Sequence, residues 1–285
     1  MAQPSGSLPE DELRRIERLR LRSVRDATGQ YYIEGLRQVF CALDVGLAID
    51  TLVYCEALAP SIAQKRARIA RRDGTPVLRL TPEEFRRISI ASRASGLGAV
   101  VTQHWSPIHE ADPSSGLCWI GLGLTRLPGN LGTVLRTAEA AGVAGLIILE
   151  DATDPFDAQT IRASMGGIFG LQLVRATHEE LADWSARHGC RIVGTSPRGD
   201  VSYSDVCLDD PLVILFGEER EGLTEKQLSL CTQTASIPTV GRADSLNLGV
   251  AAGVVLFDLL RRSRALPSAP TSFEPLESAR SSWGS

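Results

Sequence analysis

The feature that most constrains the fold is an alternation of short apolar runs with helix-length segments, which begins at Leu117. Each run has the length of a buried strand, and each intervening segment is long enough to cross to the next strand. We expect strands at 117–124, 145–149, 171–174, 191–195 and 212–216, and helices at 132–141, 157–165, 178–188, 224–230 and 247–263. Strands joined by crossover helices form a parallel sheet, and ligands bind at its carboxyl edge. The fold class is therefore α/β.

A smaller alternation precedes this series and predicts a separate α/β domain at residues 29–105. Its expected strands are 31–33, 49–55, 76–80 and 97–102, and its expected helices are 35–47, 61–72 and one capped by Thr81 with Pro82 following. The other expected segments are a basic extension at 1–28 with a helix over 10–25, a linker at 106–116, the main domain at 117–264, and unstructured ends at 1–9 and 265–285.

The composition supports two domains and excludes several protein classes. Among 285 residues, 43% are hydrophobic, which is enough for two cores. The sequence contains no apolar run of membrane-spanning length and no signal peptide, so we expect a cytoplasmic protein that does not bind membranes. The six cysteines are scattered without a C-x-x-C pair, which favours buried free thiols over a metal site or disulfides.

The net charge is −4, but the basic residues are unevenly distributed. Residues 1–112 hold 16 Lys and Arg against 14 Asp and Glu, whereas residues 113–285 hold 14 against 20. One cluster lies between Arg14 and Arg25 and another between Lys65 and Arg72. Each cluster is either a solvated helix face or a phosphate-binding patch, and a local patch binds phosphate whatever the total charge is.

Three segments of the main domain carry polar residues at the expected carboxyl edge. They are 127–136, where a Gly-Asn turn precedes a helix; 215–223, where a strand enters a glycine-bounded charged turn; and 237–247, which precedes a helix rich in small residues. Glycines at such turns let the backbone approach a ligand closely. Each segment alone is equally typical of an ordinary α/β loop.

Together the three segments resemble the motifs of the SpoU, or TrmH-like, branch of the SPOUT RNA methyltransferases. The matching stretches are PGNLGTVLRTA at 128–138, LFGEEREGL at 215–223 and IPTVGRADSLNLGVAA at 237–252. Residues 30–101 also resemble the family's ribosomal-protein-like (L30e-like) substrate-binding domain. The resemblance implies a SPOUT-type parallel sheet that contains a trefoil knot, although knotted chains are otherwise rare. Two positions depart from the family pattern: Arg126 stands near a common acidic position, and Gly249 replaces a common Ser.

The family transfers a methyl group from S-adenosylmethionine to a ribose 2′-hydroxyl of RNA and forms homodimers, so the resemblance implies both for this chain, with no metal. Carried over by position, the cofactor site comprises Thr195, Ser196, Leu215, Gly217, Ile237 and Leu246. The polar active-site positions are Asn130, Arg136, Glu219, Ser245 and Asn247. As RNA contacts we expect Arg22, Arg25, Arg66 and Arg68 from the two basic clusters.

Arg136 matches the residue that is often proposed to accept the hydroxyl proton. A guanidinium keeps its proton up to about pH 12, so its use as a base near pH 7 would cost about 7 kcal/mol. We therefore expect Arg136 to bind and polarise the ribose or its phosphate, and to accept a proton only late in the reaction. It lies six residues after Asn130, so both reach one site only if the helix starts late. We expect Asn130 and Ser245 to hold the ribose, and Glu219 and Asn247 to fix the arginine and the loop.

Three alternatives remain open at this point. The first concerns the RNA. We expect 23S-type ribosomal RNA because of the ribosomal-protein-like domain, with transfer RNA as second choice. The residues fit a housekeeping role and an antibiotic-resistance role equally. A non-catalytic ribosome-assembly factor of the same fold is the second alternative. A nicotinamide-dependent enzyme is the third, but neither Gly121-Leu122-Gly123 nor Gly166-Gly167 completes the G-x-G-x-x-G fingerprint.

Overall fold

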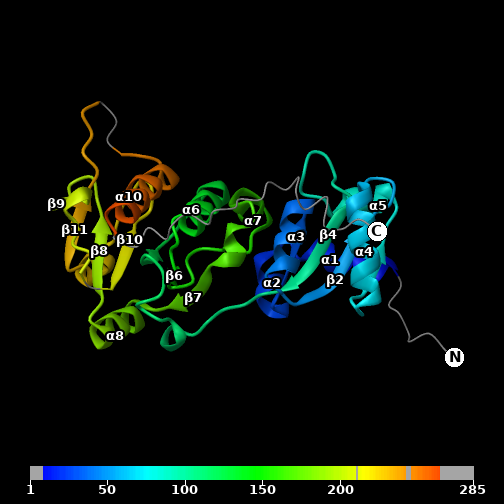
Figure 1. Cartoon of the computed structure of the whole chain (residues 1–285), viewed down its shortest axis with the longest axis horizontal. Helices are drawn as coiled ribbons and strands as arrows, with labels where there is room; N and C mark the ends of the chain where they lie inside the picture. The colour runs from blue at the N-terminus through cyan, green and yellow to red at the C-terminus, as the bar shows by residue number, and fades with distance from the viewer. Residues whose placement is uncertain (1–8, 210, 242–244, 264–285) are drawn as a thin grey trace.

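The structure is a computed structural model that describes residues 9–209, 211–241 and 245–263. Two α/β units lie side by side along the long axis of the molecule (Figure 1). The unstructured ends predicted at 1–9 and 265–285 lie outside the described residues, except that Pro9 begins the first helix.

The first unit is built on a four-stranded sheet in the order β1-β4-β2-β3. The strands are β1 (Gln30–Glu34), β2 (Ile49–Tyr54), β3 (Val77–Arg79) and β4 (Leu97–Thr102). β4 runs antiparallel to both β1 and β2, and β3 is parallel to β2. All four strands were predicted from the sequence.

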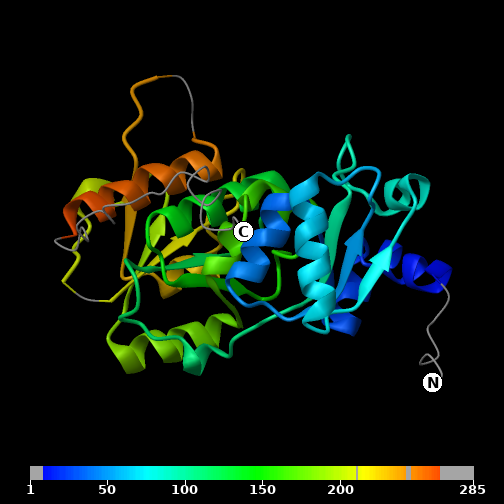
Figure 2. The same cartoon turned by 45° about the vertical axis from the view of Figure 1, so that its right-hand side comes forward.

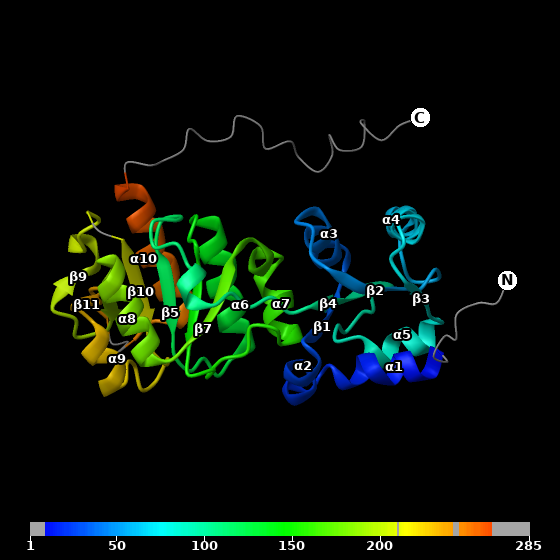
Figure 3. The same ribbon diagram turned by 90° about the horizontal axis from the view of Figure 1, so that it is seen from below.

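Helices cover both faces of this sheet, as Figure 3 shows. α3 (Leu36–Asp44) and α4 (Ser61–Arg72) pack on one face through buried alanines and Val39. α1 (Pro9–Arg18) and α5 (Pro82–Ile88) pack on the other through Leu13, Ile16 and Phe85. The predicted start of α5 is confirmed, because Thr81 and Glu84 form a reciprocal capping box. Since α1 supplies core residues, it is an integral layer of this unit.

The single helix predicted over residues 10–25 is wrong. The chain forms α1 and then α2 (Arg22–Thr28), with a turn between them. The Arg25 side chain donates to the carbonyl oxygens of Leu19 and Arg20 at 2.7 and 2.8 Å, and so satisfies two carbonyls at the break. Helical spacing of apolar residues could not reveal this break, because both helices present apolar residues to the same core.

The second unit is built on a seven-stranded, fully parallel sheet in the order β7-β6-β5-β10-β8-β11-β9. The strands are β5 (Trp119–Leu122), β6 (Gly145–Leu149), β7 (Gln172–Ala176), β8 (Arg191–Thr195), β9 (Val201–Ser202), β10 (Leu212–Phe216) and β11 (Gln233–Ser236). Five of them were predicted. β9 and β11 were not, because one is two residues long and the other, Gln-Thr-Ala-Ser, lacks an apolar run.

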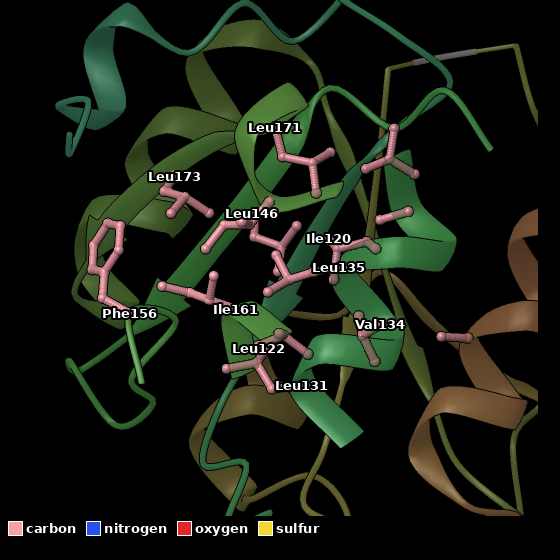
Figure 4. Close-up of a cluster of buried hydrophobic side chains, with 14 of the residues drawn as sticks. Ile120, Leu122, Leu131, Val134, Leu135, Leu146, Phe156, Ile161, Leu171 and Leu173 are labelled. Atoms are coloured by element: carbon pink, nitrogen blue, oxygen red, sulfur yellow. The ribbon is translucent and has the colours of Figure 1, made fainter. Parts of the chain in front are cut away.

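α6 (Pro128–Ala140), α7 (Ala158–Ser164) and α10 (Leu248–Arg262) cover one face of this sheet, and α8 (His178–His188) and α9 (Glu225–Leu230) cover the other (Figure 2). In Figure 4, Leu131, Val134 and Leu135 of α6 point onto Ile120 of β5 and Leu146 of β6. Short 3₁₀ segments lie at η1 (Ile108–Glu110), η2 (Gly167–Gly170) and η3 (Tyr203–Asp205).

The segment predicted as a linker, 106–116, is packed against the second unit. Ser106 pairs with Val174 beside β7, and its backbone amide donates to Leu173 at 2.8 Å. The indoles of Trp119 and Trp184 donate to the carbonyls of Asp112 and Ala111. This connection is therefore anchored by hydrogen bonds along much of its length.

Candidate active site

The predicted ligand edge carries an open pocket of about 580 Å³ in the second unit. β8 ends at Thr195 and β10 ends at Phe216, so their following loops meet at the same edge of the sheet. Residues from these two loops line the pocket together with Ile237, Thr239 and residues between Ser245 and Ala251. Three segments far apart in the sequence therefore enclose one space, as their positions after parallel strands require.

The loop after β10 is a tight turn closed by its own backbone. The Glu218 amide donates to the Gly222 carbonyl at 3.0 Å, and the Gly222 amide donates to the Glu218 carbonyl at 2.9 Å. Gly222 has a φ of 70°, which favours glycine. A Cβ on Gly217 would lie 2.2 Å from the Gly222 carbonyl carbon. Glycine at 217 thus allows the turn to fold back on the strand.

Glu219 joins the loop after β10 to the starts of α6 and α10. One oxygen of its carboxylate, Oε1, accepts hydrogen bonds from the Asn130 side-chain amide, from the Asn247 side-chain amide at 3.1 Å and from the Leu248 backbone amide at 3.3 Å. Asn247 also donates to Asn130 Oδ1 at 3.1 Å. Its own oxygen caps α10 by accepting from the Gly249 amide at 3.0 Å. The carboxylate therefore holds the starts of α6 and α10 together.

Arg136 does not join this network, which contradicts the expectation that Glu219 and Asn247 fix it. α6 starts at Pro128, not near residue 132, so Arg136 is turned well away from Asn130 around the helix. Its side chain is exposed and makes no hydrogen bond or ion pair within the described chain. On α6, Gly132 faces α7 and Thr133 faces α10. Arg136 lies on the strip of the helix between these two contacts.

Most residues expected at the cofactor site line the pocket: Thr195, Ser196, Gly217, Ile237 and Leu246, together with the expected active-site residue Ser245. Leu215 does not line it. Its side chain is buried, but its carbonyl accepts a hydrogen bond from the Thr195 hydroxyl at 3.2 Å. Leu215 thus supports the pocket wall from behind.

Charged pocket residues outside the predicted set include Arg198, Glu218, Arg220 and Glu221. Arg126, one of the two departures from the family pattern, forms an ion pair with Glu218 across the pocket rim, and this hydrogen bond raises the pKa of Arg126. The sequence offered one signal for these residues: each lies within four residues after a predicted strand or in the charged turn.

Gly249, the other departure, lies at a helix contact. A Cβ there would come within 2.7 Å of the Thr133 side chain, so glycine lets α10 approach α6.

Behind the pocket, burial raises the pKa of the Cys231 thiol to about 11 and keeps it neutral. All six cysteines are free.

The four arginines expected to contact RNA have different environments. Arg25 is only 3% exposed and forms an ion pair with Asp154. The prediction that Arg25 contacts RNA is wrong, because its guanidinium is buried and bound to this carboxylate. Arg22 pairs with Asp151 at 2.7 Å, and Arg66 pairs with Asp44 at 3.2 Å. Arg68 is exposed and borders a second hollow.

Within the described ranges, no group of three or more His, Cys, Asp or Glu side chains is placed to hold a metal ion. No helix in that part of the chain is long and apolar enough to cross a membrane.

Known proteins resemble this chain over both units. The family model of the SpoU rRNA Methylase family matches residues 119–257, and that of the MRM3-like substrate binding domain matches residues 10–99. The AdoMet-bound rRNA methyltransferase from Sinorhizobium meliloti is 35% identical, with a TM-score of 0.80 over 91% of this chain and 97% of that one.

Two further similarities come from Streptomyces viridochromogenes. The SpoU methyltransferase AviRb, in complex with AdoMet, is 28% identical, with a TM-score of 0.79 over 88% of this chain and 97% of that one. A 23S rRNA (uridine(2479)-2′-O)-methyltransferase is 28% identical over 248 residues, 85% of this chain and 86% of that protein.

Proposed function

The chain belongs to the SpoU rRNA Methylase family, and on that premise we propose that it transfers a methyl group from S-adenosylmethionine to a ribose 2′-hydroxyl of 23S-type ribosomal RNA. The observation that carries this proposal is the convergence of Asn130, Asn247 and the Leu248 amide on Glu219 beside the pocket. Named relatives of matching length include a 23S rRNA 2′-O-methyltransferase, an AdoMet-bound rRNA methyltransferase and a SpoU methyltransferase in complex with AdoMet.

The pocket suits S-adenosylmethionine in size and in chemistry. Its volume of about 580 Å³ lies within the range of roughly 300–1,000 Å³ found for small-molecule sites. Apolar walls from Phe216, Leu223 and Leu246 fit the adenosine part, and the pocket's glutamates and arginines offer partners for a cation and for a carboxylate. When bound, the cofactor supplies an electrophilic methyl group on its sulfonium.

The residues of this chain then position the acceptor hydroxyl. We propose that Asn130, held by Glu219, fixes the ribose, and that Ser245 at the pocket wall assists. Because Glu219 Oε1 accepts hydrogen bonds from donors of α6 and α10, Glu219 acts as a positioning residue. Alignment of the hydroxyl with the methyl group supplies a large part of the rate enhancement.

Arg136 binds and polarises the ribose or the neighbouring phosphate in this proposal. It lies on the solvent-facing strip of α6 and is turned away from Asn130 on the same helix. A second copy packed on the α6–α10 surface, where Val250 and Phe257 are about half exposed, would bring an Arg136 to the rim of the site. We therefore also propose a homodimer through this surface.

Two finer aspects of the fold belong to the same proposal: a trefoil knot in the second unit and an L30e-like fold of the first. α10 packs on α6 near β5, so the chain leaving β11 must cross back over the ends of β8 and β10. Stretching the molecule from its two ends tests the knot. A fully stretched chain that contains a knot is shorter than its contour length, whereas an unknotted chain extends to its full contour length.

The competing functions differ in what they bind. Methyl transfer to unmodified ribosomal and transfer RNA, followed by mapping of the nucleotide, separates the rRNA enzyme from a tRNA enzyme. Calorimetry with S-adenosylmethionine separates both from a non-catalytic assembly factor, which has no need of the cofactor. A cytoplasmic location, where ribosomal RNA is found, is part of the proposal.

A further inference from the structure

A second hollow, about 380 Å³ in volume, lies in the first unit between α4 and the end of β3. Four arginines line it: Arg68, Arg71 and Arg72 from α4 and Arg79 from β3. Glu56 is the one acidic residue in its lining, and Tyr54 forms its buried floor. We call this hollow the arginine groove. Its side chains come from two elements, so it is not simply one basic helix face.

Three of these arginines carry unneutralised charge. The side chains of Arg68, Arg71 and Arg79 are exposed and form no hydrogen bond or ion pair within the described chain, and the Arg72 side chain has only a 3.7 Å contact with its neighbour Asp73. Like charges gathered around a hollow repel one another unless an anion binds between them. The groove is therefore built to accept negative charge from outside the protein.

The opposite face of the same sheet shows the contrast. Between α1 and α5, Arg87 pairs with Glu10 and Glu17 at 3.0 and 2.9 Å. Arg15 pairs with Glu12 and Asp50, each at 2.9 Å. Those arginines are neutralised inside the protein, as on an ordinary solvated face. On the groove side, the side chains of Arg68, Arg71 and Arg79 have no such acidic partner among the described residues.

We propose that the arginine groove binds the phosphodiester backbone of the RNA substrate, at nucleotides remote from the one that is methylated. The proposal rests on the proposed function of the chain. Exposed guanidinium groups from two elements match a run of phosphates and read no base sequence. Tyr54 is 5% exposed and is thus no platform for stacking a base.

The remoteness follows from the arrangement of the two units. In Figure 1, α4 lies at the end of the molecule opposite β8 and β10, whose loops form the pocket. RNA that touches both sites must span the long axis. The groove therefore contributes to binding of a long, folded RNA, and a short oligonucleotide around the target nucleotide gains nothing from it.

The test compares the full-length protein with two double variants of equal charge change. R71A/R79A empties the groove, and R14A/R18A removes two exposed arginines from α1 on the opposite face. Neither pair is buried, so both variants should fold, and thermal unfolding checks this. Binding of an unmodified large-subunit rRNA transcript is measured over a series of salt concentrations, together with methyl transfer.

We expect R71A/R79A to bind the transcript about tenfold more weakly. We also expect its plot of log affinity against log salt concentration to fall less steeply, with a slope smaller in magnitude by about 1.5. R14A/R18A should stay within about twofold of wild type. Equal affinities and slopes for wild type and R71A/R79A, or equal losses in both variants, would overturn the groove while the wild-type enzyme still methylates RNA. Loss of methyl transfer and cofactor binding in the wild type would instead remove the proposed function and the groove with it.

Discussion

Asn130 and Glu219, 89 residues apart in the chain, are joined by a hydrogen bond from the asparagine amide to the glutamate carboxylate. Asn247 and the Leu248 amide donate to the same oxygen. One side chain therefore fixes the relative position of two helix starts at the pocket. Its removal should affect catalysis and stability together.

Glu219→Ala leaves three donors without their shared acceptor. Each hydrogen bond to a charged group contributes about 1.5–3 kcal/mol, so we expect kcat to fall at least tenfold and the unfolding midpoint to drop. Glu219→Gln keeps one carbonyl oxygen and should retain more of both. Steady-state methylation and thermal unfolding measure the two effects. An alanine variant with wild-type kcat would show that the network is dispensable.

Arg136→Ala should abolish methyl transfer and leave cofactor affinity within a few-fold of wild type. The side chain is exposed and bonds to no described residue, so its loss should not unfold the protein. Arg136→Lys keeps the charge but loses the planar fork, and partial activity is expected. Turnover assays and calorimetry on the same preparations give the comparison. Preserved turnover in the alanine variant would refute the assignment of Arg136.

Gly217→Ala should weaken cofactor binding at least about tenfold, because a Cβ 2.2 Å from the Gly222 backbone forces the turn to move. Gly129→Ala is the matched control, since a Cβ there meets nothing within 4 Å. Calorimetry with S-adenosylmethionine should separate the two variants clearly. Equal affinities would place the cofactor away from this turn.

Arg25→Ala should destabilise the protein by about 3 kcal/mol, because it leaves Asp154 without its buried partner and two carbonyls without a donor. Arg22→Ala removes a half-exposed pair with Asp151 and should cost less than about 1 kcal/mol. Chemical denaturation measures both. If the two variants lose equal stability, the buried role given to Arg25 is incorrect.

The sequence predicted those features that depend on local patterns. β6, β8 and β10 have the predicted bounds. β6 and β10 are fully buried parallel strands whose residues form one apolar run, and β8 has a buried centre, Ile192 to Gly194, between Arg191 and Thr195. β11 was not predicted because its residues, Gln-Thr-Ala-Ser, contain no apolar run. Its pairing with β8 and β9 depends on the tertiary fold. Local patterns carry no information about such long-range pairing.

The sequence predicted which residues belong to the candidate site, but it did not predict the hydrogen bonds between them. Resemblance to the family identified Glu219 and Asn130, but their hydrogen bond joins distant segments and is visible only in the fold. The start of α6 at Pro128 separated Arg136 from Asn130, and a Pro at the first helical position was the signal for that earlier start. Arg25 looked like surface charge because sequence spacing does not reveal a partner such as Asp154.

The most direct test of the central claim is transfer of a labelled methyl group from S-adenosylmethionine to unmodified ribosomal RNA, followed by alkaline hydrolysis and mapping. We predict that label enters the ribosomal RNA at one nucleotide, and that the bond on the 3′ side of that nucleotide resists alkaline cleavage because its 2′-oxygen is methylated. Label on a base, label in transfer RNA alone, or no label in either RNA would contradict the proposed function.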